Sequence, residues 1–412
     1  MRAARILLLA AAVATGAAAI YLAASVPSEP ATVRLPLDAD DRALLALVPA
    51  DAKAFAFVPS AAALHRRLLA HPVTQRGFER WTGRQNLPRP WMIGNGDLVA
   101  WQSGDGVHYA LRVDALRAFL VRVYLQWSGK EGSREGRVFI VGERGGPRIG
   151  RAELDALSSL ASGLPAAHAL LIQREGGTFP PIARPAATAV TVSEREIFLA
   201  SRAATADGAV PKPAPSIRFP RSALVTAWFS EPPRAIDDLD RLLRARVSAL
   251  LRDGGAIALY GVESGTLMPR PREVFILPAA EDRRRLLDEF VRGLAPQTLR
   301  DALGLRLETA DTGSELLVAF DRTSIGKYRA DVLVEPRFPG AAWSLRLDVA
   351  GARPALDRVV DSPALRFATP RLHRSARNLA RWLGGLEGAA TIEAAVFKRP
   401  EGEELRVVIS PK

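Results

Sequence analysis

Cysteine is absent from the 412-residue sequence, and histidine occurs only five times. The lack of cysteine excludes disulfide bonds, a thiolate metal site and a cysteine nucleophile, so packing alone must hold the folded chain together. No histidine stands in the His-x-His or His-Glu-x-x-His spacing that is typical of a zinc site. The histidines are His65, His71, His108, His168 and His373. We therefore predict no metal ion and no cofactor.

Sequence motifs of hydrolases are missing as well. The chain has no Gly-x-Ser-x-Gly elbow, the turn that exposes the nucleophilic serine of many hydrolases. Asp237, Asp238 and Asp240 lie close together, but they fall in the first turn of an expected helix, where carboxylates favourably oppose the helix dipole. The pattern favours a protein without enzymatic activity, and an envelope hydrolase stays open as an alternative.

Charge is absent from residues 6–24, which are almost entirely apolar. A helix of this length rises about 28 Å, close to the roughly 30 Å thickness of a hydrocarbon core. Arg2 and Arg5 precede the apolar run, whereas acidic residues predominate after it. By the positive-inside rule, residues 6–24 are predicted to cross the bacterial inner membrane once, with a cytoplasmic N-terminus and a periplasmic body.

Residues 1–25 fit two descriptions. The long apolar run favours a retained signal anchor, but Ala23-Ala24-Ser25 could also serve as the cleavage site of a signal peptide, which would make the protein soluble in the periplasm. The segment that follows begins with Val26-Pro-Ser-Glu-Pro. Its prolines favour an extended linker over residues 26–43.

The chain carries 56 basic and 44 acidic residues, and its net charge is +12. A positive surplus favours anionic partners such as acidic lipid headgroups or envelope polymers. Arginine and alanine are also abundant, as in proteins from high-GC genomes, so charge alone does not assign a ligand. No nucleic-acid recognition module is visible, and we expect no nucleic-acid partner.

A proline-led strand pattern occurs three times in the body, at Pro49, Pro220 and Pro339. Each copy continues with an alternating apolar strand, a helix and a hairpin-like pair of strands, which is the beginning of a β-α-β-β-α-β unit. We therefore predict an α+β fold with an N-terminal transmembrane helix. Two to three repeated β-α-β-β(-α-β) modules would follow, with antiparallel sheets covered by helices on one face.

The expected domain boundaries follow from these repeats and from a segment rich in alanine and proline between the first two copies. A chain of this length is expected to form two or three domains. The segments are a signal region at 1–25, a linker at 26–43, a first module at 44–204, a linker at 205–216, a second module at 217–335 and a shorter third module at 336–412 that packs on the second.

Two predicted helices have recognisable apolar faces. Asp114 is expected to cap a helix whose inner face is formed by Leu116, Phe119, Leu120, Val123 and Trp127. Near the C-terminus, the predicted inner face consists of Leu372, Ala376, Leu379, Trp382, Leu383 and Leu386, and the outer face of Arg371, Arg374, Arg377 and Arg381. Such a basic surface suits a helix on an anionic membrane, but it is more typical of a core helix whose outer face is solvated.

The glycine-rich segment 142–150 lies between an expected strand and an expected helix. This is the context of an anion-binding loop, in which Arg144, Arg148 and Arg151 would supply positive charge. The segment lacks the Gly-Lys-Ser/Thr ending of a P-loop, and Pro147 removes one backbone donor. An exposed connection is the favoured interpretation, with anion binding as the alternative.

The turn Leu47-Val-Pro-Ala-Asp-Ala52 follows soon after the apolar N-terminal run. In this respect the chain resembles an uncharacterised family of bacterial membrane-anchored envelope proteins with a Leu-x-Pro-Ala-Asp turn, over residues 44–200 and with a weaker echo to 321. The resemblance implies an envelope location and a repeated α+β body, and it supplies no activity and no site residues.

These observations favour a non-enzymatic, membrane-tethered envelope protein that acts as a binding or scaffolding module in the periplasm. Its partner would be another envelope protein, an anionic lipid or an envelope polymer. A carrier of a lipid or another hydrophobic ligand is the alternative, because helices packed on antiparallel sheets can enclose an apolar pocket.

Overall fold

The computed structural model describes most of residues 29–412, and they form two compact units. Unit 1 comprises residues up to 206 together with 401–405, and unit 2 comprises residues 207–400 and 406–412. The description omits 1–28, 34–36, 77–89, 95, 104–105, 128, 130–131, 142–146, 175–184, 204–217, 231–250, 252–253, 264–269, 294–306, 363–365, 367–369, 385, 387 and 400–401. The expected membrane segment, the expected linker at 205–216 and the acidic cluster at 237–240 therefore lie outside the described residues. Most of the expected linker at 26–43 is described, and helix α2 (Ala39–Leu45) begins within it.

Unit 1 contains eight strands in the order β8-β7-β6-β1-β2-β3-β5-β4, and all neighbours pair antiparallel. Their bounds are β1 Ala54–Val58, β2 Leu98–Ser103, β3 Gly106–Arg112, β4 Gly132–Glu135, β5 Val138–Val141, β6 Ala169–Gln173, β7 Ala186–Val192 and β8 Ile197–Ala203. The first strand lies inside the sheet, because Phe55 pairs with Trp101 on one side and with Ile172 on the other.

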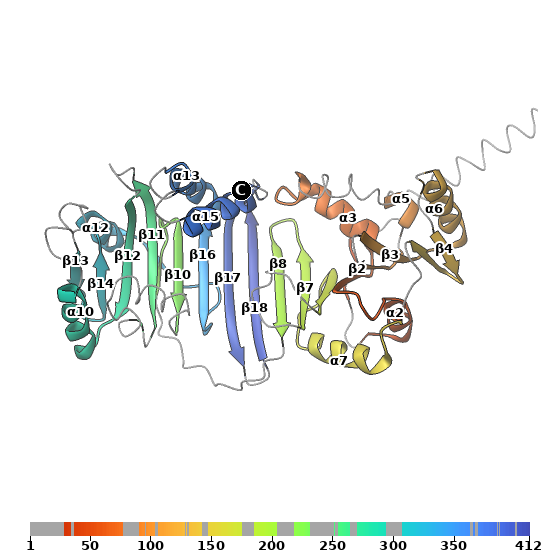
Figure 1. The fold of residues 1–412 in the computed structure, drawn as a ribbon, viewed down its shortest axis with the longest axis horizontal. Coiled ribbons are helices and arrows are strands. Elements are labelled where there is room, and N and C mark those ends of the chain that lie inside the picture. Colours follow the sequence, from red (N-terminus) through yellow and green to blue (C-terminus); the bar gives the residue numbers. More distant parts are fainter. Residues whose placement is uncertain are drawn as a thin grey trace, which may run out of the picture. The chain divides into compact units, whose positions relative to one another are not determined.

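The remaining eight strands, which belong to unit 2 except for residues 402–405 of β18, follow in the order β13-β14-β12-β11-β10-β16-β17-β18 (Figure 1). They are β10 Val225–Phe229, β11 Gly255–Glu263, β12 Arg270–Pro278, β13 Glu308–Asp311, β14 Glu315–Ala319, β16 Trp343–Asp348, β17 Ala389–Arg399 and β18 Gly402–Pro411. Here too the first strand is internal, because Ala227 pairs with Ile257 and with Leu345.

The two units share one strand order. From the edge strand β4, the strands of unit 1 follow in the order β4-β5-β3-β2-β1-β6-β7-β8, and those of unit 2 follow in the order β13-β14-β12-β11-β10-β16-β17-β18. The two successions are the same when β10 is counted as the first sheet strand of unit 2, so that β1 corresponds to β10 and β6 to β16. A short pairing precedes the first strand in both: Val33 bridges to Ala167, and β9 (Phe219–Pro220) pairs with β15 (Leu333–Val334). The chain is therefore a tandem repeat of one eight-stranded unit.

Helices lie on both faces of the sheet in each unit. In unit 1 they are α2 Ala39–Leu45, α3 Ala61–Ala70, α5 Pro90–Ile93, α6 Ala115–Trp127 and α7 Arg151–Ala161, and in unit 2 they are α10 Glu281–Gly293, α12 Arg322–Ala330, α13 Val349–Val360 and α15 Pro370–Gly384. In unit 1, α7 packs through Leu157 into the cluster that contains Phe57 and Ile140. Leu125 of α6 instead approaches Phe139, the neighbour of Ile140 that points to the opposite face.

The predicted fold class is wrong in its organisation. Within the described residues, sixteen strands form antiparallel sheet, eight for each copy of the repeat, and helices cover two faces rather than one. The strand after Pro339 does not begin a third module: β16 pairs with β10 and is the sixth strand of unit 2. The sequence pattern of a turn, an alternating strand and a helix can occur at any strand of such a sheet. The position of a strand in the sheet is instead decided by the strands with which it pairs, and the local sequence does not show these.

Among the described residues, no helix is long and apolar enough to cross a membrane.

Candidate functional site

Helix α6 begins at a capped end and buries an arginine. The Asp114 carboxylate accepts the backbone N–H of Arg117 at 2.9 Å and also pairs with the Arg117 guanidinium. Arg117 is only 4% exposed, and Ala118, Val121 and Leu125 are buried beside it. Positions 117, 121 and 125 follow one another at helical spacing, so this face of α6 points to the sheet.

The predicted inner face of α6 is its outer face. Leu116 is 39% exposed, Phe119 62%, Val123 46% and Trp127 87%, whereas Leu120 is half-buried. The four exposed side chains recur every three or four residues and therefore form one stripe along the helix. We call Leu116, Phe119, Val123 and Trp127 the α6 stripe.

The α6 stripe is unusual within this protein. Six large apolar side chains are exposed among the described residues, and four of them belong to the stripe; the other two, Val332 and Leu379, lie in unit 2. Exposed apolar side chains are normal when scattered, but a contiguous set marks a surface that other molecules contact.

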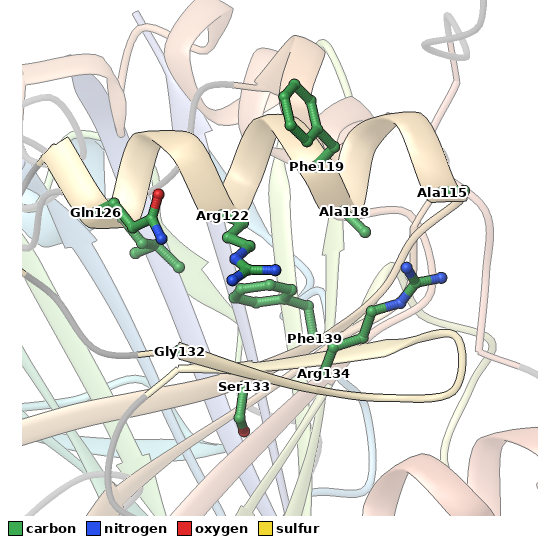
Figure 2. Close-up of a pocket in the computed structure, with 10 residues that line it drawn as sticks. Ala115, Ala118, Phe119, Arg122, Gln126, Gly132, Ser133, Arg134 and Phe139 are labelled. Carbon is green, nitrogen blue, oxygen red and sulfur yellow. The ribbon is translucent and has the colours of Figure 1, made fainter.

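A groove of about 420 Å³ runs between α6 and the hairpin of β4 and β5 (Figure 2). Its lining consists of Ala115, Ala118, Phe119, Arg122, Leu125, Gln126, Gly132, Ser133, Arg134 and Phe139. Arg122 reaches from α6 toward the Phe139 ring, whereas the Phe119 ring points away from the strands. Gly132 leaves space for the Phe139 ring at the bottom of the groove, because a Cβ at position 132 would stand 2.6 Å from that ring.

The charges around the groove are positive. Arg122 and Arg134 are exposed, and neither has an ion-pair partner in the residues the structure describes. Arg134 donates only to the carbonyl of Gly136, at 2.8 Å. The nearest acids on these elements are already engaged, Asp114 with Arg117 and Glu135 with Arg148. Two guanidinium groups thus border an apolar surface.

Helix α10 is the equivalent of α6 in unit 2, because each follows the third strand and precedes the edge hairpin. Arg283 of α10 is 3% exposed and, like Arg117, stands five residues after the end of its strand. On this alignment, Leu116, Phe119 and Val123 correspond to Asp282, Arg285 and Glu289, all exposed. The fold therefore accepts a charged outer face, and the α6 stripe is not required by packing.

Two of the three arginines of the predicted anion-binding loop, Arg148 and Arg151, lie in the described part of the chain. Arg144 lies outside the described residues. Arg148 is exposed and pairs with Glu135 at 3.4 Å, and its backbone bridges to Pro49. Arg151 begins α7 and is exposed.

The basic outer face of α15 is present in part. Arg374, Arg377 and Arg381 are exposed, and nothing is described of the Arg371 side chain. Ala376 and Leu383 are buried as predicted, but Leu379 is 44% exposed and does not belong to the inner face.

Three carboxyl groups outside α6 have raised pKa values. Burial, with a smaller contribution from Asp321, raises the pKa of Glu273 on β12 to about 7. In unit 1, burial and Asp38 raise the pKa of Asp41 to about 6, and burial also raises that of Asp97. Burial is the largest cause in each case, so these shifts reflect packing rather than a paired acid and base. Across the described ranges, no three histidine, aspartate or glutamate side chains cluster as metal ligands would.

Comparison of the chain with family models, with curated proteins and with solved structures found no match.

Sequence reasoning identified the residues of the α6 stripe but assigned them to the core. The signal that distinguishes the two faces is the comparison with α10, which carries charges at the equivalent positions and keeps an arginine at the buried one. That comparison needs the correct alignment of the repeat, which the strand order supplies.

Proposed function

We propose that this protein is a non-enzymatic binding module of the bacterial envelope, tethered to the inner membrane through residues 6–24, and that it binds its partner through the α6 stripe and the adjoining groove. One observation supports the binding role most directly. The outer face of α6 is apolar, whereas the equivalent face of α10 carries Asp282, Arg285 and Glu289.

Apolar surface that is exposed to water favours binding, because a partner that covers it removes it from water. Burying such area contributes about 25 cal/mol per Å², and aromatic side chains bury the largest areas. Phe119 and Trp127 are the most exposed members of the stripe. Aromatic and arginine side chains are also the residue types that most often dominate binding interfaces.

Photo-crosslinking in living cells tests the binding role. A benzophenone amino acid at position 119 is expected to give adducts in the envelope fraction, because this position lies on the stripe. The matched control carries the same amino acid at position 285, the equivalent exposed site on α10. Adducts that are equally abundant from both positions, or absent from 119, would contradict the proposal.

The proposed tether rests on the uncharged run at 6–24 and on its resemblance to anchored envelope proteins. Fractionation followed by N-terminal sequencing tests it. An intact N-terminus in the membrane fraction is the expected result. A mature chain that begins near Val26 in the soluble periplasmic fraction would replace the tether with a cleaved signal peptide.

A carrier of a lipid or another hydrophobic ligand is the second candidate, and the groove with its floor of Phe139 and Leu125 favours it. Native mass spectrometry separates the two functions, because a carrier is expected to retain a bound ligand through purification. Phe139→Arg, which fills the groove, would abolish that ligand peak.

A further inference from the structure

We propose that the α6 stripe is a docking surface for an anionic lipid bilayer, with its apolar side chains inserted at the level of the headgroups and its arginines against the phosphates. This inference rests on the proposed function and names the partner of the same surface. It commits to the membrane surface, rather than to one extracted lipid or to a protein.

The composition of the stripe matches the interfacial zone of a membrane. Trp127 and Phe119 lie on one helix face with Leu116 and Val123. Helices that lie in the membrane plane combine such an apolar face with basic flanks, and tryptophan prefers the boundary between headgroups and acyl chains.

The charges give the lipid preference. Arg122 and Arg134 border the stripe without acidic partners in the described part of the chain. Juxtamembrane arginines are attracted to acidic lipids within about one Debye length of the surface. A bilayer of neutral net charge offers no such attraction, so docking should depend on anionic lipid and weaken in high salt.

The shape favours a bilayer over a single bound lipid. Leu116, Val123 and Trp127 do not line the groove, and the ring of Phe119 points away from the strands that form its other wall (Figure 2). A lipid held in the groove would leave most of the stripe in water. A flat apolar phase can cover all four side chains at once.

Because residues 6–24 are proposed to hold the chain at the membrane, the α6 stripe needs only a low affinity for the bilayer. A chain held to the membrane meets it at a high effective concentration, so docking becomes intramolecular and needs little affinity of its own.

The absence of cysteine gives a direct experiment, because one introduced cysteine can be labelled uniquely. Val123→Cys places a nitroxide on the stripe, and Glu289→Cys places one at the equivalent position of α10. Both side chains are exposed, so the labels should not disturb the fold, and circular dichroism checks this. The full chain is reconstituted into vesicles of phosphatidylcholine alone or of phosphatidylcholine with phosphatidylglycerol.

The collision rates of the label with oxygen and with a water-soluble nickel chelate report whether it lies in lipid or in water. With phosphatidylglycerol present, the label at 123 should gain oxygen collisions and lose nickel collisions, and the label at 289 should remain aqueous. Adding Leu116→Asp and Phe119→Arg, the side-chain types found on α10, should return the label at 123 to water. Arg122→Gln with Arg134→Gln should remove the preference for phosphatidylglycerol.

A label at 123 that stays aqueous in both vesicles, or one that behaves like the label at 289, would overturn the inference. Membrane attachment through residues 6–24 is measured separately, by flotation of the full chain with phosphatidylcholine vesicles, because this attachment does not require α6. A protein adduct captured from position 119 together with an aqueous label at 123 would also overturn the bilayer assignment, while leaving the binding function in place.

Discussion

Arg117 and Arg283 are charged side chains on the inner faces of equivalent helices, 4% and 3% exposed. Arg117 is matched by Asp114, and Arg283 donates to the carbonyl of Pro278 at 3.1 Å. Buried arginine is tolerated when its donors find acceptors. A hydrophobicity pattern places arginine on the water-exposed face. The predicted orientation of α6 therefore differs from the observed one by about half a turn.

Gly94 should be one of the least replaceable glycines in unit 1, because it supports Arg117. Its φ is +61°, and a Cβ there would overlap the guanidinium group of Arg117. Gly94→Ala should therefore lower the free energy of unfolding by more than the roughly 1 kcal/mol typical of backbone strain alone. Chemical denaturation measures the loss.

Gly136→Ala is the matched control, because Gly136 also has a positive φ, +59°, but nothing lies within 4 Å of its Cβ position. Equal losses for the two variants would show that Arg117 does not need the space beside Gly94.

Glu273 should make the protein less stable as the pH rises. Burial raises its pKa from 4.5 to about 7, so between these pH values the unfolded chain releases a proton that the folded chain retains. The free energy of unfolding then falls as the pH rises from about 4.5 to 7 and levels off above. With about 1.4 kcal/mol per pKa unit, the loss is on the order of 3 kcal/mol.

Glu273→Gln removes the charge and keeps the shape of the side chain. Compared with the wild type, this variant should unfold at higher denaturant concentration at pH 8, and the difference should shrink toward pH 4.5. If the advantage is the same at both pH values, the cause is not the ionisation of Glu273.

At the scale of the element, α6 allows a test of which face is inside. Leu125→Ala should cost about 2–5 kcal/mol, because Leu125 is fully buried against the β4–β5 hairpin. Phe119→Ala should change the free energy of unfolding by no more than about 0.5 kcal/mol, because its ring is exposed. Denaturation of the two variants is the measurement, and the reverse ranking would restore the face that the sequence predicts.

Element positions were largely predictable, whereas their faces and partners were not. The helix expected after the glycine-rich segment 142–150 is α7, and the hairpin-like pair of strands expected in the copy at Pro49 is β2 and β3. These features follow from local capping and turn chemistry. The direction of the α6 stripe depends instead on Arg117, Gly94 and the neighbouring hairpin, which are brought together only by the fold.

At the scale of the whole molecule, the sequence revealed a repeat but not its length. The copies at Pro49 and Pro220 do begin equivalent strands, β1 and β10, and both strands show the same alternation of buried and half-buried positions. The copy at Pro339 leads into β16, which closes onto β10 across more than 100 residues of chain. A local pattern carries no information about such a pairing, and the third module was inferred wrongly for that reason.

The repeat also predicts how unfolding divides between the units. Ile172 and Ile276 are both buried, and each packs in an apolar cluster whose described members come from its own unit. Ile→Val at either position should cost about 0.5–1.5 kcal/mol. Hydrogen exchange should then accelerate several-fold in the strands of the altered unit, β1, β2 and β6 for Ile172→Val, or β10, β11 and β12 for Ile276→Val.

The paired variants control for each other, because the substitution is identical and only the unit differs. Exchange that accelerates equally in both units for either variant would mean that the two units unfold as a single cooperative body.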